Sequence, residues 1–235
     1  MTDNNNLALS QGLILSLAEE LKLPLLQIAR RAELTKMTGE SDDETIAVAA
    51  NNAICLIDNY ITGVKLAINP DNLNYETVSV SSVLYESAHE LDGIAKLYGV
   101  ELDLMIQGKF HPVTINREGL QAALTSLGMA LIEALPGQET TQLKLHFATH
   151  RSRYGVVAGI YSDNKLLTNS VLKNGRRLQR KARQPLQKIS HTNGAGIFVA
   201  DSILNSMNLR LMTSRHHNLY GLGMVLRPNN QLRLV

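Results

Sequence analysis

Residues 1–70 carry apolar side chains at the spacing of amphipathic helices. In residues 8–38 the apolar positions recur every three or four residues, and residues 43–68 repeat the pattern. The second run forms a line of apolar residues: Ile46, Ala50, Ala53, Ile57, Ile61, Val64 and Ile68. Gly39 between the runs can end one helix, and Ser41 or Asp42 can cap the next. The pattern predicts an antiparallel helical hairpin, and because two helices alone leave apolar faces uncovered, we expect two chains to form a four-helix bundle.

Residues 71–235 alternate between strand-like and helix-like patterns. Strands are predicted at residues 78–80, 100–106, 113–115, 143–149, 154–161, 209–214 and 220–226, and helices at 82–98, 117–135 and 196–208. A polar, basic segment, residues 163–192, lies between the fifth strand and the last helix. The elements do not form strict βαβ units, so the order predicts an α+β fold in which strands and helices make a sandwich.

Composition excludes several classes of protein. The chain has 235 residues, of which 44% are hydrophobic, so a disordered chain is not expected. Its one cysteine, Cys55, excludes an internal disulfide and a cysteine-based zinc site. No apolar run is long enough to cross a bilayer and the N-terminus has no secretory pattern, so we expect a cytoplasmic protein with no membrane partner. A net charge of +2 and 4% aromatic residues argue against a nucleic-acid partner.

The first helix contains the sequence Glu19-Glu-Leu-Lys-Leu-Pro-Leu25. It resembles the phosphoacceptor box of histidine kinases, His-Glu-Leu-Arg-Thr-Pro-Leu, including the proline that kinks the helix. The resemblance covers nearly the whole chain and implies a dimerisation hairpin, residues 1–70, followed by an ATP-binding domain of the histidine kinase type, residues 71–235. In the family an imidazole nitrogen accepts the phosphate. Here Glu19 occupies that position, and none of the chain's 7 histidines lies in the hairpin.

The family's phosphatase reaction uses an acidic residue beside the acceptor and a water-positioning residue three positions later. Glu20 matches the first, but Leu23 stands at the second and cannot hydrogen-bond water. The resemblance therefore implies that the kinase, phosphotransfer and phosphatase positions are all altered, and we expect no catalytic residue.

The family's nucleotide boxes are also altered. Thr125-Ser-Leu-Gly-Met-Ala130 matches the box Asn-Leu-Leu-x-Asn-Ala, with Met129 at the magnesium-binding position. Asp163 and Asn164 match the start of the adenine-binding box, whose first glycine is replaced by lysine. Gly194 and Gly196 match the third box, in which Phe198 replaces a glycine. The resemblance implies a vestigial nucleotide site made of Met129, Asp163, Asn164, Gly194 and Gly196, with no cofactor and no metal.

These observations predict a degenerate histidine kinase, or pseudo-histidine kinase, that works as a dimeric binding module in two-component signalling. The resemblance implies a response-regulator receiver domain as partner, docked on the first helix through Glu19, Glu20, Lys22, Leu23 and Gln27. One alternative is residual ATP binding or ATPase activity. Another is a polyanion bound by the basic segment 174–188, with an affinity that falls steeply with salt. The pair His216-His217 is expected at the surface, in the turn between the last two strands.

Overall fold

The computed structural model describes residues 21, 24–35, 37, 43–68, 74–106, 108, 110–134, 143–163 and 195–228. Residues 24–35 are helical. The elements that follow are α2 (Asp43–Ile68), β1 (Glu76–Val78), α3 (Val80–Leu97), β2 (Val100–Ile106), β3 (Val113–Ile115), α4 (Arg117–Ala134), β4 (Leu143–Ser152), β5 (Gly155–Ser162), α6 (Ala195–Ser206), β6 (Met212–His216) and β7 (Leu219–Leu226).

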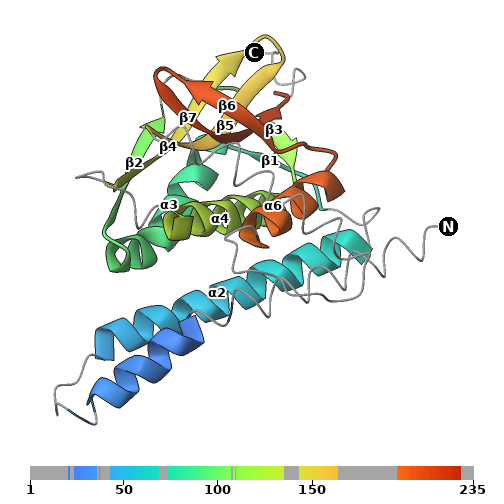
Figure 1. Ribbon diagram of the computed structural model, residues 1–235. Coiled ribbons are helices and arrows are strands. Elements are labelled where there is room, and N and C mark those ends of the chain that lie inside the picture. Colours follow the sequence, from blue (N-terminus) through green and yellow to red (C-terminus); the bar gives the residue numbers. More distant parts are fainter. Residues whose placement is uncertain are drawn as a thin grey trace, which may run out of the picture.

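Strands and helices form layers, as the sequence predicts. The main sheet has five strands in the order β2-β4-β5-β7-β6, and β1 pairs with β3 in a second, two-stranded sheet. In the main sheet β2 and β4 are parallel and the other neighbouring strands are antiparallel. The helices α3, α4 and α6 lie on one side of this sheet, and α2 crosses beneath them (Figure 1). The α+β fold is confirmed, while the N-terminal hairpin and the dimeric bundle stay predictions.

Two local signals explain where α3 begins and ends. The alternating pattern placed Val80 in a strand, but Val80 is the first residue of α3. The extended Ser79 occupies the N-cap position, and its carbonyl accepts a hydrogen bond from the amide of Val83 at 3.3 Å. At the other end Gly99 has a φ of 67°, a left-handed conformation that glycine adopts without steric cost. The amide of Gly99 donates a hydrogen bond to the Lys96 carbonyl at 3.1 Å, and the chain turns directly into β2.

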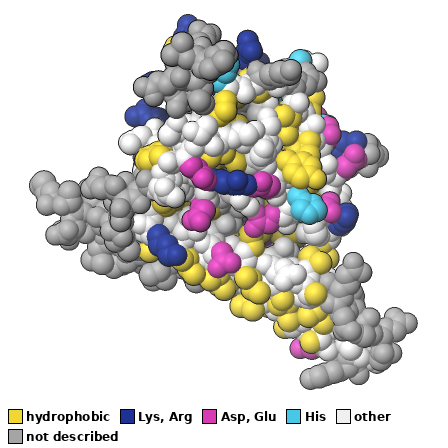
Figure 2. Space-filling model, turned by 180° about the vertical axis from the view of Figure 1, so that it is seen from behind, with side chains coloured by type: hydrophobic (Ala, Val, Ile, Leu, Met, Phe, Trp, Pro, Cys, Tyr) yellow, Lys and Arg dark blue, Asp and Glu magenta, His cyan; other side chains and the backbone are white. Residues whose placement is uncertain are grey.

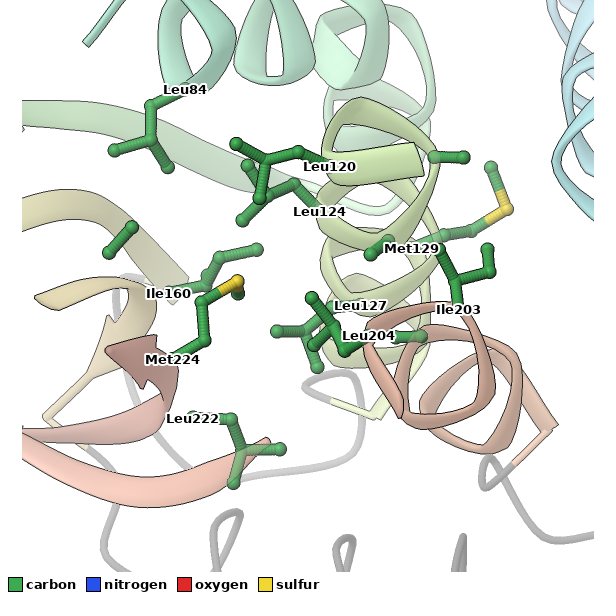
Figure 3. Packing of buried hydrophobic residues seen from close by; sticks show 14 of the residues in the cluster. Leu84, Leu120, Leu124, Leu127, Met129, Ile160, Ile203, Leu204, Leu222 and Met224 are labelled. Carbon is green, nitrogen blue, oxygen red and sulfur yellow. The ribbon is translucent and has the colours of Figure 1, made fainter. Parts of the chain in front are cut away.

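The hydrophobic core fills the space between the sheet and α4. Leu120, Leu124 and Leu127 point from α4 toward Ile160 of β5 and Met224 of β7 (Figure 3). All five side chains are fully buried. Met129 projects from another side of α4, near Ile203 of α6, so this helix is covered on more than the face that meets the sheet (Figure 3).

The second half of α2 belongs to the same core. Leu56 and Tyr60 are each 2% exposed and are part of the core cluster. Asn59 Nδ2 donates a buried hydrogen bond of 2.9 Å to Thr125 Oγ1 of α4. At Gly119 of α4, a Cβ atom would lie only 3.0 Å from Leu66 Cδ1 of α2, so the two helices are in close contact at this glycine. Thus α2 packs closely on the helical layer of the α/β domain.

Candidate functional site

The face of α4 that bears Thr125 and Met129 is turned toward other helices. The sequence resemblance predicts these two residues at the positions of the two asparagines in the first nucleotide box, and their spacing of four places them on one side of the helix. Thr125 is fully buried: its hydroxyl accepts the Asn59 amide at 2.9 Å and donates to the Gln121 carbonyl at 3.0 Å. Met129 is 3% exposed and belongs to the core cluster. Both side chains therefore contribute to packing within the chain.

The remaining nucleotide-box positions lie at the ends of two elements. Asp163 follows β5 and is exposed, and Ser162 Oγ donates to its carboxylate at 3.2 Å. Gly196 lies in the first turn of α6 and is buried. Phe198 is 3% exposed and its ring belongs to the core cluster. Asn164 and Gly194 lie outside the described residues. The vestigial nucleotide site as a whole stays a prediction.

Of the predicted docking residues, only Gln27 lies within the described part of the chain; Glu19, Glu20, Lys22 and Leu23 lie outside it. Gln27 is half-buried, and its amide donates to the Tyr98 hydroxyl at 3.3 Å, which ties the first helix to the end of α3. Gln27 therefore has a structural contact that the sequence did not predict.

Glu133 near the end of α4 adds a titratable group to this junction. Burial raises the pKa of Glu133 to about 7. Burial also raises the pKa of Tyr98 to about 12, with a smaller contribution from the negative charge of Glu133. The hydrogen bond from Gln27 acts in the opposite direction on the pKa of Tyr98.

Large apolar side chains remain exposed on the first helix and on α2. We call this set the outer helix face: Leu25, Leu26, Leu34, Met37, Ile54, Ile57 and Ile61. Hydrophobic surface gathers along this arm of the molecule (Figure 2). The apolar line predicted from the sequence is divided, because Ala53 is 8% exposed whereas Ile57 and Ile61 are 37% and 44% exposed. An exposed apolar face of this kind marks an interaction surface.

The expectation of a surface location was wrong for His216. Ile160 points into the core, so the next residue, Tyr161, points to the opposite face of the sheet, where its ring is fully buried. The rings of His150 and His216 lie 6.1 and 5.7 Å from the Tyr161 ring and 5.1 Å from each other. His216 is therefore 7% exposed, while His217 occupies the turn with a φ of 51°.

Two ring nitrogens of this histidine cluster have no hydrogen-bond partner among the described residues. They are Nδ1 of His150 and Nε2 of His216, both buried. Burial lowers the pKa of both side chains, and repulsion from His217 lowers it further. No group of three or more metal-binding side chains occurs among the described residues, so the cluster is read as a packing feature that favours neutral histidines.

Acidification is expected to destabilise the fold through these histidines. Their pKa values are lower in the folded chain than the ordinary value of 6.5, so the unfolded chain binds protons first and the free energy of unfolding falls as the pH drops below about 6.5. Urea unfolding at pH 8 and pH 5.5 measures this loss, which should be smaller in the His150→Gln variant. An equal loss in both proteins would remove His150 as its cause.

Within the described ranges, no helix is long and apolar enough to cross a membrane. No protein-family model matches the chain, and no curated protein matches it in sequence.

Solved structures do match. A bacterial phosphotransferase is 11% identical, with 93% of this chain and 96% of that chain covered and a TM-score of 0.54. The full-length histidine kinase ShkA, in complex with AMPPNP, is 9% identical over 79% of this chain and 38% of its own length, with a TM-score of 0.52. The Acinetobacter baumannii histidine kinase AdeS is 14% identical over 90% of this chain and 98% of its own, with a TM-score of 0.49. The chain thus shares its fold with a bacterial phosphotransferase and with a histidine kinase.

Proposed function

We propose that this chain is a non-catalytic, dimeric relative of histidine kinases that docks the receiver domain of a response regulator. One observation carries the non-catalytic part of the proposal. The α4 face that would contribute magnesium-binding side chains instead holds Thr125, bonded to Asn59 of α2, and Met129, which is 3% exposed. The likeness in fold to a bacterial phosphotransferase and to ShkA supports a place in two-component signalling.

The chemistry of Met129 opposes nucleotide binding. A magnesium ion takes oxygen ligands in near-octahedral geometry, and a thioether is soft and apolar. A buried methionine thus provides neither the ligand nor the access to solvent that a metal–phosphate complex needs. Because Asn59 of α2 bonds Thr125 of this helix and the neighbouring Leu56 and Tyr60 belong to the core cluster, opening the face would also break core contacts.

The acceptor position supports the same proposal. Glu19 has a carboxylate in place of the imidazole that receives phosphate in the family. If the acceptor, the magnesium ligand and the water-positioning residue are all replaced, the function that remains for the chain is to bind a partner protein. Pro24 remains within the first helix, where a proline costs about 3 kcal/mol, and its kink would shape the surface beside Glu19.

A second copy of the chain is the proposed partner of the outer helix face. Of the twelve exposed large hydrophobic residues in the described part of the chain, seven belong to this face. Pairing two such faces would remove them from water and build the four-helix bundle expected from the sequence. The receiver domain would then dock at the surface near Lys22 and Gln27, next to the part of the dimer contact formed by Leu25 and Leu26.

Capture of partners from extract of the source cells tests the docking. The wild-type protein should retain a receiver-domain protein, identified by mass spectrometry, in a manner that depends on magnesium or on the partner's phosphorylation. Lys22→Glu and Gln27→Trp should each weaken retention at least tenfold, because one reverses a charge and the other blocks the surface.

The variant Tyr98→Phe is the matched control for Gln27. It removes the hydrogen bond that Gln27 donates, while leaving the surface of the first helix unchanged. Retention should survive in Tyr98→Phe and after neutralisation of the basic residues in 174–188. If retention instead depends on segment 174–188 and ignores Lys22 and Gln27, binding of a polyanion or acidic protein replaces receiver docking.

A further inference from the structure

A pocket of about 480 Å³ lies on the α/β domain, where β3, the end of α6 and the last strands meet. The residues lining it that carry the argument are Tyr75, Tyr154, Met207, Arg210, Met212 and Arg227, and we call it the arginine pocket. The volume falls within the range of about 300–1,000 Å³ that is typical of small-molecule sites. An isolated bridge between Val113 and Pro228 joins the small sheet to the end of β7 beside it.

The arginine pocket is distinct from the predicted nucleotide site. Tyr154 precedes β5 and Met207 follows α6, whereas Asp163 follows β5 and Gly196 lies in the first turn of α6. The two locations are thus at opposite ends of the same two elements. Neither Met129 nor Asp163 lines the arginine pocket.

Part of the wall and rim of the pocket is apolar. Met207 and Leu226 are buried in its wall, at 5% and 1% exposure. At the rim Tyr75, Tyr154 and Met212 are 45%, 63% and 40% exposed. They are three of the five exposed large hydrophobic residues described in the α/β domain, so exposed apolar surface is concentrated at this rim. Methionine adapts its shape to a ligand, and a tyrosine ring presents a flat face.

The charge of the pocket is positive. Arg210 and Arg227 line it, no acidic residue does, and neither arginine forms an ion pair with any described residue. By contrast, Lys96, Arg117 and Lys144 form ion pairs with Asp92, Glu86 and Glu101. The guanidinium of Arg153 lies 4.5 Å above the Tyr154 ring and adds a third cation near the rim. The planar guanidinium matches carboxylate and phosphate oxygens in geometry.

We propose that the arginine pocket binds a small organic anion, whose flat apolar body lies against Tyr154 and Met212 and whose carboxylate, sulfonate or phosphate pairs with Arg210 and Arg227. The apolar walls provide affinity for the body of the ligand. The arginines select for the anion, since a neutral molecule of the same shape leaves them unpaired. This binding site is independent of receiver docking and of the outer helix face.

Two fluorescent probes of similar shape test the proposal. 8-Anilinonaphthalene-1-sulfonate carries one sulfonate, and N-phenyl-1-naphthylamine is its uncharged parent. Titration of the full chain should give saturable binding of the sulfonate, tighter than that of the neutral probe by at least fivefold and weakened by added salt. Arg210→Gln and Arg227→Gln should each reduce the affinity for the sulfonate three- to tenfold and leave the affinity for the neutral probe unchanged.

Arg215→Gln is the matched control, because it removes the same charge from β6 at a position that does not line the pocket. Tyr154→Ser should weaken both probes, since it removes the apolar contact. Equal effects of Arg210→Gln, Arg227→Gln and Arg215→Gln would show a general effect of surface charge and overturn the proposal. Absence of saturable sulfonate binding below 1 mM would also overturn it.

Discussion

Replacing Ile57 and Ile61 by glutamate is expected to convert the protein from a dimer into a monomer. Both side chains lie on the outer helix face, exposed by 37% and 44%, where pairing of two chains would bury them. Full burial of an exposed isoleucine contributes about 1.5–3 kcal/mol, and about two-fifths of each side chain is still exposed, so four such side chains per dimer contribute about 2–5 kcal/mol. A loss of about 3 kcal/mol corresponds to more than a hundredfold weaker association. Light scattering coupled to size exclusion at micromolar concentration measures the change.

Leu104→Glu is the matched control for this prediction. Leu104 lies on β2 and is 38% exposed, so the substitution adds the same charge at an aliphatic residue of similar exposure away from the helices. The control should remain dimeric. Circular dichroism should show that all variants stay folded, because none of these side chains belongs to the core cluster. A wild-type protein that is monomeric at micromolar concentration would refute the dimer.

Strands whose pattern is local were predicted well from the sequence. Residues 100–106 and 113–115 match β2 and β3, because alternation between apolar and polar residues reflects a strand that is buried on one side. The predicted start of a helix differed from the observed start where a single residue determines it. Val80 fits an alternating pattern with Val78, but the extended Ser79 before it caps a helix.

Contacts between distant residues were not predictable from periodicity. Asn59 and Thr125 lie far apart in the chain, and nothing in either helix shows that α2 packs on α4. The burial of His216 depends on Tyr161, whose ring lies close over Gly159, Gly221 and Gly223 of β5 and β7. The repeated glycines in these two strands were the available signal, because they leave room for a large ring on the outer face.

The candidate site was also predictable from the sequence only in its local features. The family resemblance identified Met129 as a position without a metal-binding side chain. A methionine in a helix rich in apolar residues is expected to pack in a core. Sequence alone did not show that α2 approaches this face of α4, nor that Gln27 bonds Tyr98. The arginine pocket was missed because its walls come from β3, α6, β6 and β7, which only the folded chain brings together.

Restoring the missing histidine should not restore phosphorylation. The variant Glu19→His provides an imidazole acceptor but leaves Met129 buried, at the position proposed to lack a magnesium ligand, and Thr125 bonded to Asn59. On the proposal that the chain binds no nucleotide, the new histidine has no phosphate donor. We therefore expect the wild type and Glu19→His to behave alike, although the variant carries the side chain that accepts phosphate in the family.

Incubation with ATP labelled at the γ-phosphate, in the presence of magnesium, tests the central proposal most directly. An active histidine kinase in the same buffer serves as the positive control, and the reaction is quenched at neutral pH so that an acyl phosphate would also survive. The account predicts no label on the wild-type chain or on Glu19→His. Stable label on any residue of the hairpin in the wild-type chain would contradict it.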